Sequence, residues 1–323
     1  MDKIINLKKF WKNKRVFITG HTGFKGSWLI ILLKLLGAKV FGYALKPDKK
    51  SLFNQIDGDK IIDGNYFGNI NDLKILNSKI NLFKPEIIFH LAAQSLVIDS
   101  YLDPLKTYKT NLMGTANILE AIRKKKFIKS VVIITTDKVY KPRKNIKKFS
   151  ETDELGGYDP YSASKSCSEI LLNSYIHCFF ENSNLKNKVS SARSGNVIGG
   201  GDYSKNRLLP DIINSINFNK SLYIRNPNHV RPWQHVIEPI IGYLLLSQKL
   251  FEKKLNKYHG WNFGPENNNM ISVIKLVNLI KKNYPLKIKL KKQRPFYESS
   301  VLRLNNSKSK KFLNWKPRWG MKQ

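Results

Sequence analysis

Long apolar runs are missing from this sequence of 323 residues. The longest apolar stretch, from Trp28 to Leu36, is interrupted by Lys34 and is shorter than the roughly 18 residues of a membrane-spanning helix. The first residues, from Met1 to Trp11, alternate lysine with apolar side chains and contain no small-residue cleavage site. We therefore expect neither a membrane span nor a signal peptide.

Cysteine is scarce as well. The two cysteines, Cys167 and Cys178, lie in one segment with a helical pattern, eleven positions apart. On a helix this spacing is about 16 Å, whereas a disulfide needs Cα atoms within about 7 Å. The two thiols cannot pair if the helix forms, and free thiols suit a reducing compartment. We expect a cytoplasmic protein.

Acidic residues and arginine are also few. The chain has 23 Asp and Glu against 57 Lys and Arg, a net charge of +34, and only ten of the basic residues are arginine. Arginine suits bidentate phosphate contacts better than lysine, and the lysines are scattered rather than gathered in one patch. We expect no specific nucleic-acid partner, although the charge should attract an anionic substrate.

Short apolar runs alternate with longer helical patterns through the first 196 residues. The pattern predicts strands at Arg15–Thr19, Lys39–Ala44, Glu86–Leu91, Ser130–Thr135 and Lys188–Ala192, and helices ending at Leu36 and spanning Leu73–Phe83, Pro104–Lys124 and Tyr161–Phe180. Such alternation is typical of an α/β fold of the Rossmann type, with a doubly wound parallel sheet covered by helices on both faces.

The pattern loosens after residue 196, where helices are expected at Leu208–Asn217, Ile237–Phe251 and Ser272–Asn283. We expect residues 1–196, with 232–258 returning to them, to form a dinucleotide-binding domain. Residues 197–231 and 259–323 are expected to form a smaller, partly discontinuous lobe that binds substrate. It should lie over the C-terminal edge of the sheet, where such folds bind ligands.

A glycine motif, Gly20-x-x-Gly23-x-x-Gly26, follows the first strand and opens a helix. In this context the first glycine permits a tight turn, the second lets the backbone approach a pyrophosphate, and the third allows close packing of helix on strand. The acidic residue that would hold the ribose of NAD is absent after the second strand, where Lys46 stands. A lysine is compatible with the 2′-phosphate of NADP, so the sequence leaves this choice open.

A tyrosine followed by a lysine four residues later occurs at Tyr140 and again at Tyr161. In so lysine-rich a chain the spacing alone means little, and Pro142 prevents a regular helix after Tyr140. Tyr161 and Lys165 instead begin an unbroken helical pattern, where positions i and i+4 share one face. A neighbouring ammonium and the positive nicotinamide ring of a bound cofactor would lower the pKa of the phenol, and Tyr161 could then act as a base.

A strand end places Thr136, Asp137 and Lys138 upstream of this tyrosine. The hydroxyl of Thr136 could bond the same substrate oxygen as Tyr161, as in a simple alcohol dehydrogenase. The acid and the amine that follow it suggest chemistry beyond hydride transfer.

Seven segments of the chain resemble one family: GHTGFKGSWL (20–29), HLAAQSLV (90–97), TTDKVY (135–140), LGGYDPYSASK (155–165), SGNVIGGGD (194–202), RPWQHV (231–236) and WNFGP (261–265). The chain resembles the extended short-chain dehydrogenase/reductases, the NAD-dependent epimerase/dehydratase family. Within them it is most similar to the sugar-nucleotide 4,6-dehydratases that act on CDP-glucose. Lys138 favours this group, because the relatives that act on dTDP-glucose usually have Glu there.

The resemblance implies dehydration of CDP-glucose to CDP-4-dehydro-6-deoxyglucose in deoxysugar synthesis, with NAD regenerated in each turnover. Tyr161 would take the proton of the 4-hydroxyl, Asp137 would protonate the departing 6-hydroxyl, and Lys138 stands where the family's C5 base sits. Burial would favour the neutral form of both Asp137 and Lys138, and their mutual attraction would oppose it. Which of the two is acid and which is base stays open.

The resemblance also implies the binding residues. NAD would be held by Gly20, Thr22, Gly23, Phe24, Gly26, Asn69, Ile70, Leu91, Ala92, Ala93, Thr110, Tyr161 and Lys165, and substrate by Gln94, Asn196, Arg207 and Arg231. No metal is expected. The helices Pro104–Lys124 and Tyr161–Phe180 would form a four-helix bundle in a homodimer.

The chain departs from the family pattern at three places. Asn69 replaces an Asp near the adenine, Tyr297-Glu298-Ser299 replaces a His-Glu-Ala-like sequence, and the chain stops at Gln323, where the family continues into one more helix. Three other functions stay open. The chain could be another sugar-nucleotide 4,6-dehydratase. A 4-epimerase would need Tyr161 but neither Asp137 nor Lys138, and a non-catalytic Rossmann protein could bind polyanions through its charge.

Overall fold

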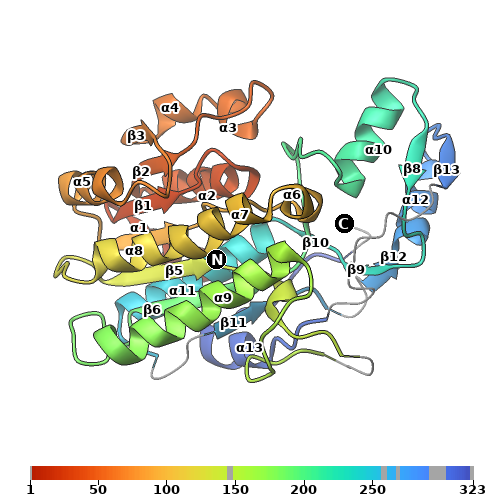
Figure 1. Ribbon diagram of the computed structural model, residues 1–323. Helices are drawn as coiled ribbons and strands as arrows, with labels where there is room; N and C mark the ends of the chain where they lie inside the picture. Colours follow the sequence, from red (N-terminus) through yellow and green to blue (C-terminus); the bar gives the residue numbers. More distant parts are fainter. Residues whose placement is uncertain (1, 144–147, 256–259, 267–269, 291–302, 321–323) are drawn as a thin grey trace.

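A parallel sheet forms the centre of the molecule (Figure 1). The computed structural model describes residues 2–143, 148–255, 260–266, 270–290 and 303–320, with side chains from residue 7 onward. Within these residues seven strands follow the order β11-β6-β5-β4-β1-β2-β3, and every neighbouring pair is parallel. The strands are β1 (Arg15–Thr19), β2 (Lys39–Ala44), β3 (Gly64–Phe67), β4 (Ile87–His90), β5 (Ser130–Ile134), β6 (Val189–Ser194) and β11 (Gly260–Phe263). The predicted α/β sheet of the Rossmann type is confirmed.

Helices cover both faces of the sheet (Figure 1). One layer contains α1 (Asp2–Trp11), α2 (Phe24–Leu35), α11 (Ile237–Phe251) and α13 (Ser307–Leu313); the other contains α5 (Leu73–Phe83), α8 (Gly114–Ile122) and α9 (Pro160–Tyr175). Alternate residues of each strand pack on opposite layers: Val16 and Ile18 contact the first layer, and Phe17 contacts the second. This two-sided burial explains why the central strands read as continuous apolar runs.

The two long helices expected from the sequence each contain a π-helical turn. Residues 104–122 form α7 (Pro104–Tyr108), the π-turn η1 (Lys109–Met113) and α8 without a break. After Tyr175, α9 continues into the π-turn η3 (Ile176–Phe180). Such turns insert one extra residue and are frequent at functional sites.

A smaller lobe with its own apolar core lies beyond the carboxyl ends of the strands (Figure 1). It contains α10 (Leu208–Asn217) and α12 (Val273–Lys281), with strand pairs β8 (Leu222–Ile224)/β13 (Ile288–Leu290) and β9 (Val230–Pro232)/β12 (Met270–Ser272). The short pair β7 (Val197–Ile198)/β10 (Gln234–His235) joins lobe and sheet. The short elements α3 (Leu52–Gln55), α4 (Gly58–Ile61), α6 (Val97–Leu102) and the 3₁₀ turn η2 (Asp137–Val139) lie in loops.

The expected lobe boundary at residue 259 needs one correction. β11 pairs with β6 in the large sheet, and Leu313 of α13 packs in the core on the α2 side of that sheet. The chain therefore enters the lobe, returns to complete the sheet, enters the lobe again and returns once more. Tyr297-Glu298-Ser299 and Lys144 lie outside the described residues. No helix in the described part of the chain has the length and apolarity to cross a membrane.

Candidate active site

A cavity of about 1700 Å³ lies between the carboxyl ends of the strands and the lobe. Most of the residues predicted to bind cofactor or substrate line it: Gly20, Thr22, Gly23, Phe24, Gly26, Asn69, Ile70, Leu91, Ala92, Ala93, Thr110, Thr136, Lys138, Tyr161, Lys165, Asn196, Arg207 and Arg231. Two predicted residues, Asp137 and Gln94, are not part of its lining. Residues far apart in the sequence thus meet where an α/β fold of this kind binds ligands.

The glycine loop fits a pyrophosphate because its glycines leave no room for side chains. Gly20 has a φ of +74°, and a Cβ there would lie 2.6 Å from the backbone nitrogen of Ala92. A Cβ on Gly26 would collide with the carbonyl oxygen of Gly20. At the N-terminus of α2, Gly23 has no side chain to cap the helix, so the first N–H groups can face a phosphate in the cavity.

The end of β2 carries no acidic side chain. Lys46 follows it and lines the cavity, as does Asp48 two residues later. The hydroxyl of Thr22 donates to the carbonyl oxygen of Leu45 at 3.0 Å, which ties the glycine loop to this segment. Like the sequence, these lining residues leave the choice between a 2′-hydroxyl and a 2′-phosphate on the adenosine ribose open.

Thr136, Asp137 and Lys138 form a tight turn directly after β5. The Thr136 hydroxyl donates to Oδ1 of Asp137 at 3.0 Å, accepts from the backbone nitrogen of Lys138 at 3.3 Å, and is hydrogen-bonded to Tyr161. Asp137 is only 2% exposed, and burial raises the pKa of its carboxyl although the positive charge of Lys138 opposes this. Asp137 is therefore biased toward the protonated form that a general acid needs.

Tyr161 and Lys165 lie in the first turns of α9, which begins with Pro160 and is capped by Asp159. Nζ of Lys165 donates to the carbonyl oxygen of Ile134 at 3.1 Å, and burial lowers the pKa of this amine to about 8. The helix thus places both side chains beside the turn after β5.

The pKa of Tyr161 lies above its ordinary value in the protein without cofactor. The lowered value expected from the sequence requires the positive nicotinamide ring; without it, burial raises the pKa of this phenol to about 12, and any negative charge on Asp137 adds to the effect. The hydrogen bond with Thr136 and the positive charge of Arg207 oppose it. Desolvation is the largest of these effects, so Tyr161 is a neutral phenol in this state.

Lys25 is a functional candidate that the sequence analysis did not single out. It stands inside the glycine motif, and its Nζ donates to the hydroxyl of Ser194 at 2.8 Å, which in turn lies 2.6 Å from the hydroxyl of Tyr243. Burial and the charge of Arg207 lower the pKa of Lys25 to about 7. The sequence signal that could have identified Lys25 was its place inside the glycine motif, whose loop lines the cavity.

The predicted substrate residues have different surroundings. Arg231 is buried, and its Nη2 lies 3.0 Å from Nδ1 of His229, whereas Arg207 forms an ion pair of 3.0 Å with Asp202 at the cavity wall. Asn196 is exposed at the rim. Two guanidinium groups that line one cavity suit a diphosphate.

The side chain of Gln94 bonds to neighbouring groups of the protein and does not line the cavity. Its Nε2 donates to the hydroxyl of Thr107 at 2.9 Å and to the carbonyl oxygen of Leu96, and its Oε1 accepts from the Leu96 backbone nitrogen at 2.6 Å. Because these bonds use both ends of the amide, the predicted contact of Gln94 with substrate finds no support in its geometry.

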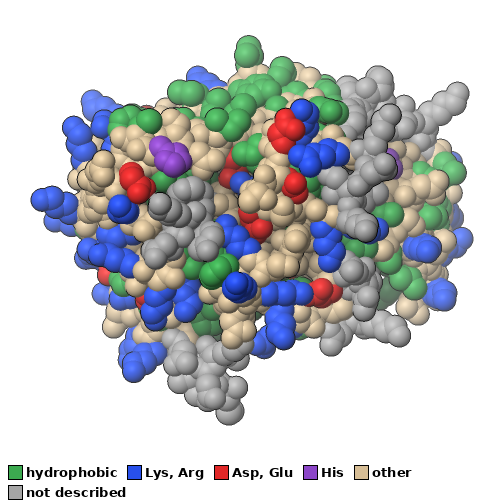
Figure 2. Space-filling model, turned by 90° about the horizontal axis from the view of Figure 1, so that it is seen from below, with side chains coloured by type: hydrophobic (Ala, Val, Ile, Leu, Met, Phe, Trp, Pro, Cys, Tyr) green, Lys and Arg blue, Asp and Glu red, His purple; other side chains and the backbone are tan. Residues whose placement is uncertain are grey.

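Positive charge is spread over the molecule rather than concentrated. Figure 2 shows Lys and Arg side chains scattered across one face, separated by polar and apolar groups. This dispersion fits general attraction of anions better than a nucleic-acid footprint. Among the described residues, no group of three or more His, Cys, Asp or Glu could hold a metal ion.

Three lysines with lowered pKa values predict that stability rises with pH. The pKa is about 7 for Lys25 and about 8 for Lys165 and Lys308, mainly because of burial, against an ordinary value of 10.5. From pH 7 toward 10 the unfolded chain binds more protons than the folded one, so the free energy of unfolding should increase. Each group contributes at most about 1.4 kcal/mol per pH unit. Urea unfolding at pH 7 and pH 9 measures the rise.

The matched variant is Lys25→Met, which removes one of the three groups. It should unfold at a higher urea concentration than the unaltered protein at pH 7, with a smaller gain between pH 7 and pH 9. An unchanged gain would show that the amine of Lys25 is not desolvated.

Comparisons with known proteins agree with this geometry. Residues 17–323 match the protein family described as GDP-mannose 4,6 dehydratase. The CDP-glucose 4,6-dehydratase of Salmonella typhimurium is 43% identical over 97% of this chain and 89% of its own length. A dTDP-glucose 4,6-dehydratase from Bacillus anthracis, solved in complex with NAD, superposes with a TM-score of 0.79 at 22% identity, over 96% of this chain and 93% of that one. A UDP-glucose 4-epimerase from Thermotoga maritima, solved with UDP-glucose, gives 0.80 at 23% identity, over 95% and 94%.

Proposed function

Because the chain belongs to the GDP-mannose 4,6 dehydratase family, we propose that it is an NAD-dependent lyase that converts CDP-glucose to CDP-4-dehydro-6-deoxyglucose in deoxysugar synthesis. Its 43% identity with the Salmonella enzyme over nearly the whole chain supports the substrate. The observation that carries the proposal is the turn of Thr136, Asp137 and Lys138 beside Tyr161. This turn brings the carboxyl of Asp137 and the amine of Lys138 to the same site as Tyr161 and Lys165.

The large domain would hold NAD at the glycine loop, between the ends of β1, β2 and β4. When bound, NAD supplies reversible oxidation of the sugar. Lys165 supplies donors for ribose hydroxyls, and Gly20 and Gly26 keep the loop free of side chains. Phe24, Ile70 and Leu91 supply apolar surface in the same part of the cavity.

Tyr161 removes the proton of the 4-hydroxyl, assisted by the hydroxyl of Thr136. Burial keeps this phenol neutral, so it becomes a base only where added positive charge lowers its pKa. Arg207 already acts in that direction, and the positive nicotinamide ring of bound NAD would add to it.

Asp137 and Lys138 then act as the acid and the base in the loss of water. The buried, protonated Asp137 donates a proton to the leaving 6-hydroxyl, and the half-buried amine of Lys138, which lines the cavity, takes the proton from C5. The burial of Asp137 supports its part in this assignment, since desolvation favours a neutral acid.

The lobe would bind the nucleotide half of the substrate. Arg207 and Arg231 both line the cavity and match the bidentate geometry of phosphate oxygens. Asn196 lies at the junction between sheet and lobe, where the sugar would be positioned. The unpaired thiols of Cys167 and Cys178 support a reducing location, and we propose the cytoplasm.

Turnover of separate sugar nucleotides tests the function. The purified protein is incubated with NAD and, in parallel, with CDP-glucose, dTDP-glucose, UDP-glucose and GDP-mannose, and 4-keto-6-deoxy sugars are detected by their ultraviolet absorbance in alkali. We expect product from CDP-glucose at the highest kcat/KM. Product from dTDP-glucose alone would refute the nucleotide assignment, and conversion of UDP-glucose to its 4-epimer would support the epimerase instead.

We also propose a homodimer formed by the outer faces of two neighbouring helical segments. α7, η1 and α8 pack beside α9 and leave Leu105 81%, Met113 51% and Ile170 56% exposed. Apolar side chains of this size, exposed on adjacent helices, are typical of a protein interface.

Replacing Leu105 and Ile170 together with Glu should shift the protein to monomers, because a second copy would have to bury both new charges. Sedimentation velocity at micromolar concentration measures the change. The control is Leu290→Glu, which alters a side chain that is 70% exposed on the lobe and should leave the oligomer intact. A monomer before any substitution would contradict the dimer.

A further inference from the structure

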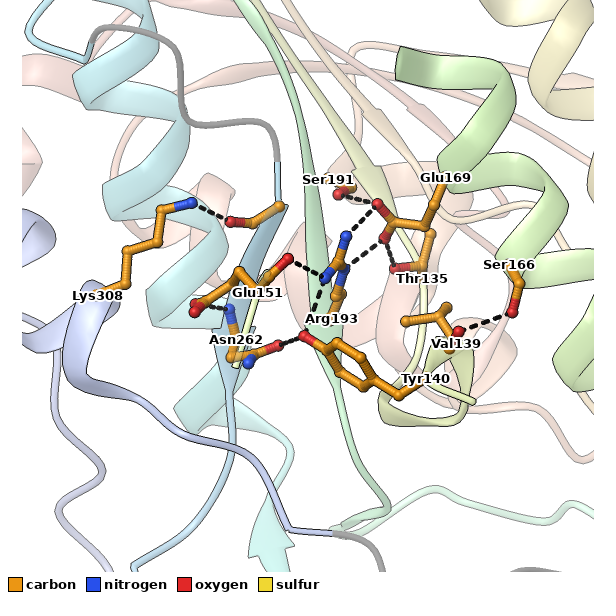
Figure 3. A network of polar contacts seen from close by, with 11 residues as sticks. Thr135, Val139, Tyr140, Glu151, Ser166, Glu169, Ser191, Arg193, Asn262 and Lys308 are labelled. Carbon is orange, nitrogen blue, oxygen red and sulfur yellow. Dashed lines mark hydrogen bonds and ion pairs between the residues drawn. The ribbon is translucent and has the colours of Figure 1, made fainter. Parts of the chain in front are cut away.

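A buried ion pair lies directly behind the turn that carries Thr136, Asp137 and Lys138 (Figure 3). Arg193 of β6 and Glu169 of α9 have side chains only 4% and 2% exposed. Their contact is bidentate: Nε donates to Oε1 at 3.0 Å and Nη2 donates to Oε2 at 2.9 Å. The proposed function assigns no role to either residue.

The pair holds both ends of this turn (Figure 3). On the entry side, the hydroxyl of Thr135 donates to Oε1 of Glu169 at 2.6 Å. On the exit side, Nη1 of Arg193 donates to the hydroxyl of Tyr140 at 2.9 Å. Thr136, Asp137, Lys138 and Val139 lie between these two anchors, so the carboxylate fixes the start of the turn and the guanidinium fixes its end.

Further contacts make the exit anchor rigid. The ring of Tyr140 stacks on Phe149 with centroids 4.8 Å apart, and its hydroxyl donates to Oδ1 of Asn262 at 2.6 Å. Burial raises the pKa of Tyr140, so its proton remains available for that bond. The hydroxyl of Ser166 donates to the carbonyl oxygen of Val139 at 2.9 Å. A buried network satisfied in this way resists rearrangement.

Burial works against ionisation of Glu169, yet Arg193 and the hydroxyls of Ser191 and Thr135 keep the pKa of its carboxyl below the ordinary value. The carboxylate is therefore charged. Its charge also reaches Lys165, which lies one helical turn earlier on α9, and opposes the loss of its proton.

Lys165 is surrounded by few groups that could replace this charge. The pKa of Lys25 from α2 is lowered mainly by burial, and repulsion from Arg207 and Lys165 adds to this. His90 from β4 is neutral because burial and Lys165 lower its pKa to about 3. From β5 the carbonyl oxygen of Ile134 accepts its bond. Among these neighbours, Glu169 is the group whose negative charge stabilises the ammonium.

We propose that Glu169 and Arg193 form a positioning pair, which fixes the turn of Thr136, Asp137 and Lys138 at both ends and supplies the negative charge that faces Lys165. The catalytic consequence of this inference rests on the proposed function. The expected effect on the rigidity of the turn does not depend on the reaction and can be measured without substrate.

Three variants separate the two roles of the pair. Glu169→Gln keeps the shape of the side chain but removes its charge. Arg193→Lys keeps the charge but cannot span both Glu169 and Tyr140. Glu238→Gln is the control, because Glu238 is another buried carboxylate, at the start of α11, whose Oε1 accepts from the backbone nitrogens of Arg318 and Trp319.

Hydrogen exchange measured by mass spectrometry tests the anchors in the protein without ligand. Peptides that span Thr135 to Tyr140 should exchange about tenfold faster in Glu169→Gln and in Arg193→Lys, because local opening of the turn becomes easier. Glu238→Gln should lower the melting temperature but leave exchange at the turn unchanged.

The pH dependence of NAD affinity, measured by calorimetry, tests the charge. In Glu169→Gln affinity should be lost at a pH about one unit lower, since the ammonium of Lys165 is no longer stabilised. Arg193→Lys should keep the pH profile of the unaltered protein. On CDP-glucose, kcat should fall by about 100-fold in both variants with little change in KM, as expected for misplaced reacting groups.

The outcomes are distinguishable. If the unaltered protein turns over no sugar nucleotide but the exchange and pH changes occur, the proposed function fails and the positioning pair stands. If both variants behave like Glu238→Gln, with lower stability and an unaltered turn and pH profile, the pair is only structural and the inference is overturned.

Discussion

Replacing Asp137 with Asn should slow the loss of water from CDP-glucose by about 10²- to 10⁴-fold, the range lost when a general acid is removed. The amide keeps the size and one hydrogen-bond acceptor of the side chain, so Thr136 can still donate to it as it does to Oδ1 of Asp137. It cannot give a proton to a leaving hydroxyl. Since Asp137 is not among the residues proposed to hold NAD, NAD affinity should change little.

Two measurements check this expectation: the rate of appearance of the 4-keto-6-deoxy product and the dissociation constant for NAD. The control is Asp63→Asn, which removes an ion pair of 2.7 Å with Lys34 far from the turn. Parallel loss of turnover and NAD affinity would assign Asp137 a structural role. Undiminished turnover of any sugar nucleotide would instead favour an epimerase, which has no need of this acid.

Replacing Gly26 with Ala should lower NAD affinity by at least about 100-fold, the equivalent of losing one or two charge-assisted hydrogen bonds. The new Cβ would collide with the backbone of Gly20 and His21, which cannot move aside as a flexible side chain could. The loop must therefore shift and lose its fit to the pyrophosphate. We also expect a loss of about 1 to 3 kcal/mol in the free energy of unfolding, as for other overpacked sites.

Calorimetric titration with NAD and urea unfolding measure the two effects. Gly200→Ala is the matched control, because Gly200 also lines the cavity but has no heavy atom within 4 Å of the position that a Cβ would take. It should bind NAD as the unaltered protein does. If Gly26→Ala also binds NAD normally, the glycine loop is not the pyrophosphate site.

The sequence predicted most of the sheet because its inner strands are buried on both sides. β1, β4 and β5 consist almost entirely of buried residues, so each appears as an apolar run that local pattern alone reveals. β3 escaped prediction because it is an edge strand of only four residues, three of them half-buried and Phe67 exposed. β11 was assigned to the lobe because its partner β6 lies 66 residues or more away in the sequence, and local pattern carries no information about such pairing.

The candidate site was predicted in its composition but not in its electrostatics. Residue types and spacing identified Asp137, Tyr161 and Lys165, and the structure brings them together. The raised pKa of Tyr161 in the protein without cofactor was not predicted, because it depends on how completely the fold removes water, which no spacing encodes. Lys25 was overlooked since its significance comes from Ser194, which the chain reaches 169 residues later.

The place of β11 in the sheet also affects how the protein is made. The turn at Asp137 leaves the ribosome in the first half of synthesis, yet the acceptor for the hydroxyl of Tyr140 is Asn262, near the end of the chain. Until β11 emerges, β6 is an unpaired sheet edge and the exit of the turn lacks one of its anchors. A nascent chain stalled before residue 260 would therefore carry every proposed catalytic residue, but with an open sheet edge and an unfinished site.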